Sequence, residues 1–311
     1  MKTVTFKGYR FSQLTLGTVQ LGMPYGISNS QGMPGDRDAL DILRTAVDAG
    51  ITTFDTARQY GASEAVLGRF SATCEGADLN MVSKFKIAPQ DAGALERAWK
   101  SVEASVRTSI ECLGIRKLPV CLLHKGEESM DAVAGILPVI ISRLREQELI
   151  DIGGVSVYEP ADVAFCLSEP LVEAVQVPVS IFDQRLVVSG ALQRLAQAQK
   201  LVFARSVFLQ GLFFMDPGQI NGNLKPAIPF LKQLHAFARE YPGDVAGLAF
   251  SYVRDLPGID SIVVGAVTPA QLAGNVKLLG APEIPASLRN EFTQVFTAIS
   301  DEILTPGRWK I

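Results

Sequence analysis

Strand and helix signals alternate along the whole chain, and this alternation constrains the fold more than any other feature. Amphipathic stretches typical of helices lie at Asp38–Ala49, Ala92–Leu113, Asp131–Gln147 and Pro226–Glu240. In Ala92–Leu113, apolar residues recur at three- and four-residue steps, as expected of a helix packed on a sheet. The short apolar runs between such stretches predict eight strands: Leu14–Val19, Thr52–Thr56, Leu79–Lys84, Pro119–His124, Asp151–Val157, Ala174–Val179, Leu201–Ser206 and Ser261–Val267.

Eight strands with intervening helices predict a closed parallel (β/α)8 TIM barrel. The alternative is a doubly wound open sheet, which normally carries a GxGxxG motif after its first strand. The first predicted strand continues as Leu16-Gly17-Thr18-Val19-Gln20-Leu21-Gly22, which lacks that spacing. A barrel of this kind commonly forms one domain at a length of 311 residues, so we expect a single domain over 1–311.

The ends and loops of the chain add further elements. Residues Val4–Phe11 alternate apolar and polar side chains around Lys7-Gly8, which predicts a β-hairpin at the base of the barrel. Residues Pro285–Ile303 are expected to form a final helix. Gly- and Pro-containing segments at Tyr25–Gly35 and Phe208–Asn223 are predicted to be the most mobile loops over the site.

Charge and composition exclude several classes of function. The net charge is −3 without a basic block, so binding of nucleic acid by a charged surface is not expected. No apolar run reaches 18 residues and the N-terminus lacks an apolar signal core, so we expect a cytoplasmic protein without a membrane span. The four cysteines lie far apart and only two histidines are present. The sequence therefore predicts buried thiols in a reducing compartment and no zinc site.

Four polar side chains follow three successive predicted strands: Asp55 and Tyr60, then Lys84, then His124. An ionisable group at the end of a buried strand is costly to desolvate unless it is paired or takes part in chemistry. A nearby ammonium is expected to lower the pKa of a tyrosine, a carboxylate keeps that lysine charged, and a histidine can hydrogen-bond a carbonyl oxygen. These parts suit carbonyl reduction. The alternative is a structural Asp55–Lys84 ion pair with Tyr60 as a half-buried residue at the rim.

Several ordered motifs give the chain a resemblance to the aldo-keto reductase superfamily. They are Leu14–Thr18, Phe54–Ala57 followed by Tyr60–Glu64, Ser83-Lys84, Leu122–His124, Gly154–Ser156 and Ser261–Gly265. The resemblance implies that Tyr60 is the general acid, that Lys84 lowers its pKa, that Asp55 pairs with Lys84, and that His124 orients the carbonyl. It also implies direct hydride transfer from a nicotinamide cofactor without a metal.

The resemblance implies a set of cofactor contacts as well. Ser156 and Gln176 match positions that hold the nicotinamide carboxamide, although Val157 stands where many relatives have Asn. Residues 204–211 match a loop along the pyrophosphate, and residues 265–275 match the adenosine end. The expected cofactor-binding residues are Gly17, Thr18, Ser156, Gln176, Arg205, Ser206, Gln210, Gly265, Thr268, Gln271 and Asn275.

Four positions in these two segments bear on the choice of cofactor and on its redox form. The resemblance implies NADP as the expected cofactor. Relatives that favour NADPH often carry Lys, Ser and Arg around the 2′-phosphate, where this chain has Gly265, Ala266 and Gln271, so NAD is the alternative. Arg205 stands where many relatives place an aromatic that stacks on nicotinamide. A cation there disfavours the positively charged, oxidised ring, so we hypothesise that Arg205 biases binding towards the reduced cofactor.

The sequence therefore predicts NAD(P)H-dependent reduction of an aldehyde or ketone, with a small-molecule carbonyl or sugar as substrate. Three alternatives stay open. The same chemistry could run in the oxidative direction, as in a sugar or alcohol dehydrogenase. The chain could be a nucleotide-binding regulatory protein on the same fold. Finally, Lys84 could form a Schiff base in a barrel lyase, although the neighbouring Asp55 argues against a neutral amine.

Overall fold

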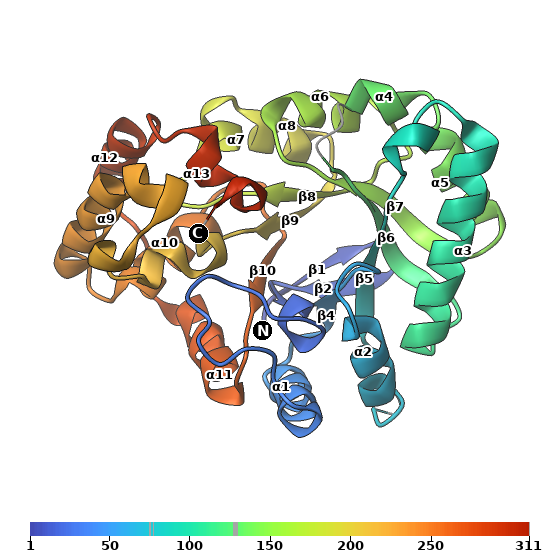
Figure 1. The fold of residues 1–311 in the computed structure, drawn as a ribbon, viewed down its shortest axis with the longest axis horizontal. Helices are drawn as coiled ribbons and strands as arrows, with labels where there is room; N and C mark the ends of the chain where they lie inside the picture. Colours follow the sequence, from blue (N-terminus) through green and yellow to red (C-terminus); the bar gives the residue numbers. More distant parts are fainter. Residues whose placement is uncertain (75, 77, 127–129, 311) are drawn as a thin grey trace.

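The computed structural model describes residues 1–74, 76, 78–126 and 130–310. Eight parallel strands form a closed barrel in the order β10-β3-β4-β5-β6-β7-β8-β9, which confirms the predicted fold class. Figure 1 shows the helices on the outside of this ring of strands. The barrel strands are β3 (Leu14–Gly17), β4 (Thr53–Asp55), β5 (Asn80–Phe85), β6 (Leu118–His124), β7 (Ile150–Ser156), β8 (Ala174–Pro178), β9 (Leu201–Arg205) and β10 (Ser261–Gly265).

The N-terminal hairpin consists of β1 (Thr3–Phe6) and β2 (Tyr9–Ser12), paired antiparallel. Lys7 and Gly8, between the strands, both have positive φ angles of 48° and 84°, as a two-residue turn of a right-twisted hairpin requires. The backbone oxygen of Arg10 accepts hydrogen bonds from the side chains of Thr52 and Asn80, where β4 and β5 begin. The hairpin therefore lies at the base of the barrel, as predicted.

Apolar side chains fill the interior of the barrel and the layer around it. Phe11 of the hairpin is fully buried among inward-facing strand residues, and its ring meets that of Phe203 edge to face at 5.8 Å. A second and larger apolar cluster lies between the strands and the helices. Because the hairpin closes the base, the opposite end of the barrel, where the strands finish, is left for a site.

The helices that connect the barrel strands begin and end close to the predicted limits in several cases. Helix α1 covers Asp36–Asp48, α3 covers Leu95–Leu113 and α9 covers Ile228–Glu240. The remaining α-helices are α2 (Ser63–Ser71), α4 (Met130–Ala134), α5 (Leu137–Glu146), α6 (Pro160–Ser168), α7 (Arg185–Val188), α8 (Ala191–Gln197), α10 (Val245–Arg254), α11 (Pro269–Lys277), α12 (Ala286–Phe296) and α13 (Asp301–Leu304).

Two predicted helices are divided in the structure. The stretch expected to be helical over Asp131–Gln147 forms α4 and α5, and Pro138 stands at the start of α5. Proline lacks an amide hydrogen and clashes with the preceding turn, so it begins a helix more readily than it continues one. The stretch Pro285–Ile303 forms α12 and α13, because Ser300 has an extended backbone (ψ 152°) that interrupts the helix.

Most strand limits lie within one residue of the prediction, and two strands end two residues early. The first barrel strand ends at Gly17 rather than Val19, since Val19–Leu21 form a 3-10 turn, and the last strand ends at Gly265 rather than Val267. Short 3-10 turns also occupy Leu209–Phe214, Pro217–Gln219 and Gly222–Ala227, within or beside the segment predicted to be a loop. The ends of the strands therefore pass early into the irregular backbone that surrounds the site.

Candidate active site

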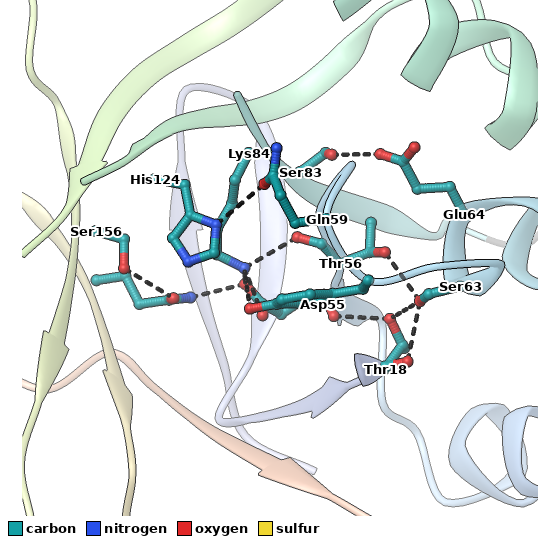
Figure 2. Close-up of polar contacts among 12 residues, drawn as sticks. Thr18, Asp55, Thr56, Gln59, Ser63, Glu64, Ser83, Lys84, His124 and Ser156 are labelled. Atoms are coloured by element: carbon teal, nitrogen blue, oxygen red, sulfur yellow. Dashed lines mark hydrogen bonds and ion pairs between the residues drawn. The ribbon is translucent and has the colours of Figure 1, made fainter. Parts of the chain in front are cut away.

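The four predicted catalytic residues come together where the strands end. Asp55 is the last residue of β4, Lys84 lies in β5, His124 is the last residue of β6, and Tyr60 follows β4 in a loop. Figure 2 shows the side chains of Asp55, Lys84 and His124 close together. The ammonium Nζ of Lys84 donates to both carboxylate oxygens of Asp55 at 2.7 Å and to the backbone oxygen of Thr56 at 2.9 Å. Both side chains of this pair are buried.

Glycine at two positions allows the loop that carries Tyr60 to approach the loop after β3. A Cβ atom on Gly22 would lie 1.9 Å from the backbone oxygen of Tyr60, and one on Gly61 would lie 2.2 Å from the backbone oxygen of Gly22. Gly61 also has a φ of 55°, which glycine adopts without strain. The phenol oxygen of Tyr60 consequently lies 3.5 Å from the ammonium of Lys84, and the ring centroid lies 4.9 Å from it.

A buried hydroxyl network holds the Asp55 end of the site in place. The Thr18 hydroxyl donates to the backbone oxygen of Asp55 at 2.9 Å, and it shares a hydrogen bond of 2.6 Å with the Ser63 hydroxyl. Ser63 in turn lies 3.0 Å from the hydroxyl of Thr56. These contacts, drawn in Figure 2, join the loop after β3, the end of β4 and the start of α2. The hydroxyl groups of Thr18, Thr56 and Ser63 are buried, and these hydrogen bonds satisfy them.

Burial sets the proton affinity of Tyr60 more than its neighbouring cation does. Burial raises the pKa of Tyr60 well above its ordinary value, and the Asp55 carboxylate raises it further, while Arg205 lowers it. The net shift is thus opposite to the one expected from Lys84 alone, and the effect of the ammonium itself stays a prediction. Burial also lowers the pKa of Lys84, against the opposing effect of Asp55. The phenol is thus held in its protonated form, ready to donate.

His124 is held as a neutral ring. Burial lowers its pKa to about 3, and the cations of Lys84, Arg205 and Lys86 contribute in the same direction. Its ring meets the ring of Tyr60 edge to face at a centroid distance of 6.0 Å. Its Nδ1 atom lies 3.2 Å from the side-chain amide oxygen of Gln59. A neutral imidazole has one donor and one acceptor nitrogen, so it can hydrogen-bond a substrate oxygen without carrying charge.

The depressed pKa of His124 predicts a loss of stability in acid. Between pH 6.5 and about 3 the unfolded chain binds a proton at this residue and the folded chain does not, so the free energy of unfolding falls as the pH falls. At pH 5 the wild type should have lost about 2 kcal/mol that a His124→Gln variant keeps. Urea unfolding of both proteins at pH 7.5 and pH 5 measures this difference. Parallel losses in the two proteins would contradict it.

A cavity of about 550 Å³ lies beside these residues and extends to the start of α11. Asp55, Tyr60 and His124 line it. Ten of the expected cofactor-binding residues line it too: Gly17, Thr18, Ser156, Gln176, Arg205, Ser206, Gln210, Gly265, Thr268 and Gln271. The eleventh, Asn275, lies outside the lining and donates from its side-chain amide to the backbone oxygen of Gly265 at 3.1 Å. Asn275 therefore holds the end of β10 in place through this hydrogen bond and does not itself line the cavity.

The groups along this cavity fit a nicotinamide dinucleotide. At one end, the amide of Gln176 donates to Asp55 at 2.7 Å and the Ser156 hydroxyl donates to the amide oxygen of Gln176 at 3.3 Å. At the other end, Thr268 caps helix α11, whose N-terminus can receive a phosphate. Between them, the amide oxygen of Gln20 is buried without a hydrogen-bond partner among the described residues. A buried acceptor without a partner can accept a hydrogen bond from an N–H or O–H group of a ligand.

Arg205 points into this cavity instead of lying on the outer surface. Its guanidinium lies over the ring of Tyr158 at 4.5 Å and donates to the backbone oxygen of Val157 at 2.9 Å and to the Ser206 hydroxyl at 3.2 Å. Within the described part of the chain it forms no ion pair. It is therefore a cation available to a ligand.

The two loops predicted to lie over the site contact each other. The amide of Ile27 donates to the backbone oxygen of Gln210 at 3.0 Å, and the side-chain amide of Gln210 donates to the Tyr25 hydroxyl at 2.9 Å. Burial raises the pKa of Tyr25 to about 12. Gly307, near the C-terminus, also lines the cavity, whereas Trp309 donates to the backbone oxygen of Ile303. Tyr25 thus lies at the rim of the cavity, whereas Trp309 packs against the apolar core and is hydrogen-bonded to α13.

Several residues that line or border the cavity had no role assigned from the sequence. Gln20, Gln59, Tyr158 and Gly307 are among them. Position offered a signal for two of them, because Gln59 directly precedes Tyr60 and Tyr158 comes two residues after Ser156. In the described residues, no cluster of three His, Cys, Asp or Glu side chains is arranged to hold a metal ion. No helix there has the length and hydropathy needed to cross a membrane.

The fold and the site define a barrel enzyme whose polar groups gather at the carboxyl ends of the strands. A model of the Aldo/keto reductase family matches residues 13–294, and the chain belongs to this family. It is an oxidoreductase. Members of the family typically use NAD(P)H.

Individual relatives agree with this assignment. The chain is 25% identical over 296 residues to a D-threo-aldose 1-dehydrogenase from a Pseudomonas species, covering 83% of this chain and 88% of that protein. It is 27% identical over 325 residues to an uncharacterized oxidoreductase from Mycobacterium tuberculosis, with 92% and 90% covered. Among solved structures, an aldo-keto reductase from Bacillus halodurans in its holo form superposes with a TM-score of 0.74 at 19% identity, over 99% of this chain and all of that one.

Proposed function

We propose that this chain reduces an aldehyde or ketone to the alcohol with NAD(P)H, and that residues 1–311 act as one barrel domain. The observation that carries the proposal is the buried Asp55–Lys84 pair with the Tyr60 phenol 3.5 Å from the ammonium, beside a neutral His124. A developing alkoxide needs a nearby proton donor and a hydrogen bond to its oxygen. This arrangement places both kinds of group at the wall of one cavity.

Each of the four residues has a separate role in this proposal. The carbonyl oxygen of the substrate accepts hydrogen bonds from the Tyr60 hydroxyl and from a ring nitrogen of His124. As a hydride reaches the carbonyl carbon, the C=O π electrons move to the oxygen, and the proton of Tyr60 passes to that oxygen. Lys84 stabilises the phenolate that this transfer leaves, and Asp55 holds Lys84 in place. Solvent then returns a proton to Tyr60.

A nicotinamide cofactor bound in the cavity supplies the hydride in this scheme. Ser156 and Gln176 would hold its carboxamide, Ser206 and Gln210 would lie along its pyrophosphate, and Gly265, Thr268 and Gln271 would hold its adenosine end. We propose NADP(H) as the cofactor, on the family resemblance, and keep NAD(H) as the alternative. Arg205 is the only Lys or Arg side chain among the described residues that line the cavity, so no lysine or arginine marks a site for a 2′-phosphate near α11.

The test of the proposed function is the loss of absorbance of NADPH, and in parallel of NADH, with a reactive aromatic aldehyde. We expect one alcohol to form for each cofactor oxidised. The faster of the two reactions identifies the preferred cofactor. A protein that binds either nucleotide and turns over neither, with a panel of aldehydes, ketones and aldoses, would instead be the nucleotide-binding regulatory protein.

A second candidate function is the oxidation of an aldose by the same residues. The similarity to a D-threo-aldose 1-dehydrogenase favours it, and the polar lining of the cavity offers partners for sugar hydroxyls. Here Tyr60 would accept the proton of the hydroxyl and a hydride would leave the carbon. Initial rates in both directions at pH 7.5, with an aldose and NAD(P)+ or with an aldehyde and NAD(P)H, distinguish the two.

Arg205 should make the protein prefer the reduced cofactor. Its guanidinium lies on the ring of Tyr158, next to the residues expected to hold the nicotinamide, and a cation there repels the positive charge of the oxidised ring. Replacing it by leucine should change the ratio of the two dissociation constants by about tenfold in favour of the oxidised form. Fluorescence or calorimetric titration with NADPH and NADP+ measures both constants without turnover.

An Arg205→Lys variant is the matched control. It keeps the charge and loses the plane that stacks on Tyr158, so it should keep most of the bias. A ratio that stays the same in the wild type, Arg205→Leu and Arg205→Lys would sink the hypothesis.

A further inference from the structure

Part of the hydrogen-bonding capacity of Arg205 is not used by the protein itself. Of the N–H groups of its guanidinium, one donates to the backbone oxygen of Val157 at 2.9 Å and another to the Ser206 hydroxyl at 3.2 Å. The guanidinium has no further hydrogen-bond partner in the described part of the chain. Because Arg205 is half-buried and lines the cavity, its remaining N–H groups can reach a ligand there.

The charge of Arg205 is also left without a counter-charge in the cavity. Among the described residues that line the cavity, Asp55 is the only acidic side chain. Its carboxylate is already engaged by the ammonium of Lys84 and by the amide of Gln176, each at 2.7 Å. The buried pair of Asp55 and Lys84 is neutral as a whole, so Arg205 leaves the cavity with an excess of positive charge. Such a cation, held in a cavity and partly removed from water, favours an anionic ligand.

This charge acts at the place where the proposed reaction occurs. It opposes the effect of burial on the pKa of Tyr60, and it adds to the effect of burial on the pKa of His124. These two side chains are the ones proposed to hydrogen-bond the substrate oxygen. Lys86, an exposed residue just after β5, acts on His124 in the same direction as Arg205. The substrate carbonyl therefore lies in a region of positive potential.

The pyrophosphate of the cofactor is the competing anion, because Ser206 is expected to lie along it. The contacts of the guanidinium favour the nicotinamide side instead. It stacks on the ring of Tyr158 at 4.5 Å and donates to Val157, and both residues directly follow Ser156, which is expected at the carboxamide. A reduced nicotinamide ring is neutral and leaves the charge of Arg205 in place. Hydride transfer needs the carbonyl carbon against this ring, so a cation beside the ring also lies beside the substrate.

We propose that Arg205 binds an anionic group of the substrate, a carboxylate or a phosphate, and that the chain acts on carbonyl compounds that carry such a group. This inference rests on the proposed reductase function, since it places the anionic group relative to a carbonyl held by Tyr60 and His124. A neutral aldose offers no counter-charge to Arg205 and should be the poorer substrate.

Two matched pairs of aldehydes test the proposal. The first pair is 4-carboxybenzaldehyde and methyl 4-formylbenzoate, and the second is glyceraldehyde 3-phosphate and glyceraldehyde. With saturating reduced cofactor, the wild type should have the higher kcat/KM for the charged member of at least one pair, and that pair identifies the anionic group as carboxylate or phosphate. A wild type that prefers the charged member of neither pair would overturn the proposal.

Two substitutions assign the preference to Arg205. In Arg205→Gln, which keeps a donor and loses the charge, the ratio of kcat/KM for the charged and neutral members should fall on the order of 10- to 100-fold. Arg205→Lys keeps the charge and should keep most of the ratio. The ratio cancels changes that affect both members equally. An unchanged ratio in Arg205→Gln, with weaker binding of NADPH and NADP+ alike, would place Arg205 on the pyrophosphate and overturn the proposal.

A binding measurement separates the failure of this proposal from the failure of the proposed function. The alcohols 4-(hydroxymethyl)benzoate and its methyl ester can bind the NADPH complex without reacting, because both partners are already reduced. By calorimetry, the wild-type complex should bind the carboxylate about tenfold or more tightly than the ester, and Arg205→Gln should lose this difference. If the difference is present and no aldehyde is reduced, the anion site stands and the reductase function fails. If aldehydes are reduced and the difference is absent, the anion site alone fails.

Discussion

Replacing Tyr60 by phenylalanine should lower kcat for aldehyde reduction by about 10²–10⁴-fold and leave the dissociation constant of NADPH nearly unchanged. The phenol oxygen is the part of the side chain that lies 3.5 Å from the ammonium of Lys84, and the ring itself packs against His124. Phenylalanine keeps the ring and removes only the proton donor. Steady-state rates and a cofactor titration on the same preparations measure the two quantities.

The pH dependence of the wild type provides the second part of this prediction. Because burial and Asp55 raise the pKa of Tyr60, its protonated form persists above the ordinary value of 10, and the ability to donate is lost only at higher pH. We therefore expect kcat for reduction to show no decline due to Tyr60 up to pH 9. Oxidation, which needs the phenolate as a base, should instead accelerate as the pH rises.

Two results would contradict this assignment. One is a Tyr60→Phe variant that keeps its rate. The other is a decline of the wild-type rate near pH 7 that disappears in the variant, which would show that Lys84 lowers the pKa of Tyr60 once the cofactor is bound. A His124→Phe variant cannot replace Tyr60→Phe in this test. It removes the proposed hydrogen bond from His124 to the substrate carbonyl and also the contact of His124 with Gln59.

The positions of the proposed catalytic side chains were predictable because they depend on the order of strands. Asp55, Lys84 and His124 end or nearly end three successive strands, and successive strands in a closed parallel barrel are neighbours. The hairpin was predictable for a similar local reason, since Lys7-Gly8 fits a two-residue turn with positive φ angles. Patterns within short segments were enough in both cases.

Properties that depend on packing were not predictable in the same way. The direction of the pKa shift of Tyr60 follows from how deeply the ring is buried, which the spacing of residues does not reveal. Asn275 matches a cofactor position by alignment of motifs, yet its amide is engaged with Gly265 and lies outside the cavity lining. The contact of Arg205 with Tyr158 joins residues 47 positions apart, and that of Gln59 with His124 joins residues 65 apart.

Removing the charge of Lys84 alone should destabilise the fold strongly as well as abolish reduction. Lys84 is 1% exposed and Asp55 is 4% exposed, so a Lys84→Met variant leaves a buried carboxylate with only the amide of Gln176 to compensate it. Breaking a buried ion pair in this way costs about 3–5 kcal/mol of the free energy of unfolding. Urea unfolding at pH 7.5 measures the loss, and the midpoint should fall without a change in the slope.

The double variant Asp55→Asn with Lys84→Met separates the structural role of this pair from its chemical one. It removes both charges together, and the amide oxygen of asparagine can still accept from Gln176, so most of the lost stability should return. Reduction should not return, because no ammonium then lies beside the phenol to stabilise its conjugate base. A double variant that is both stable and active would mean that Asp55 and Lys84 form a structural pair only. The proton donor would then have to be activated by another group, such as Arg205, whose charge lowers the pKa of Tyr60.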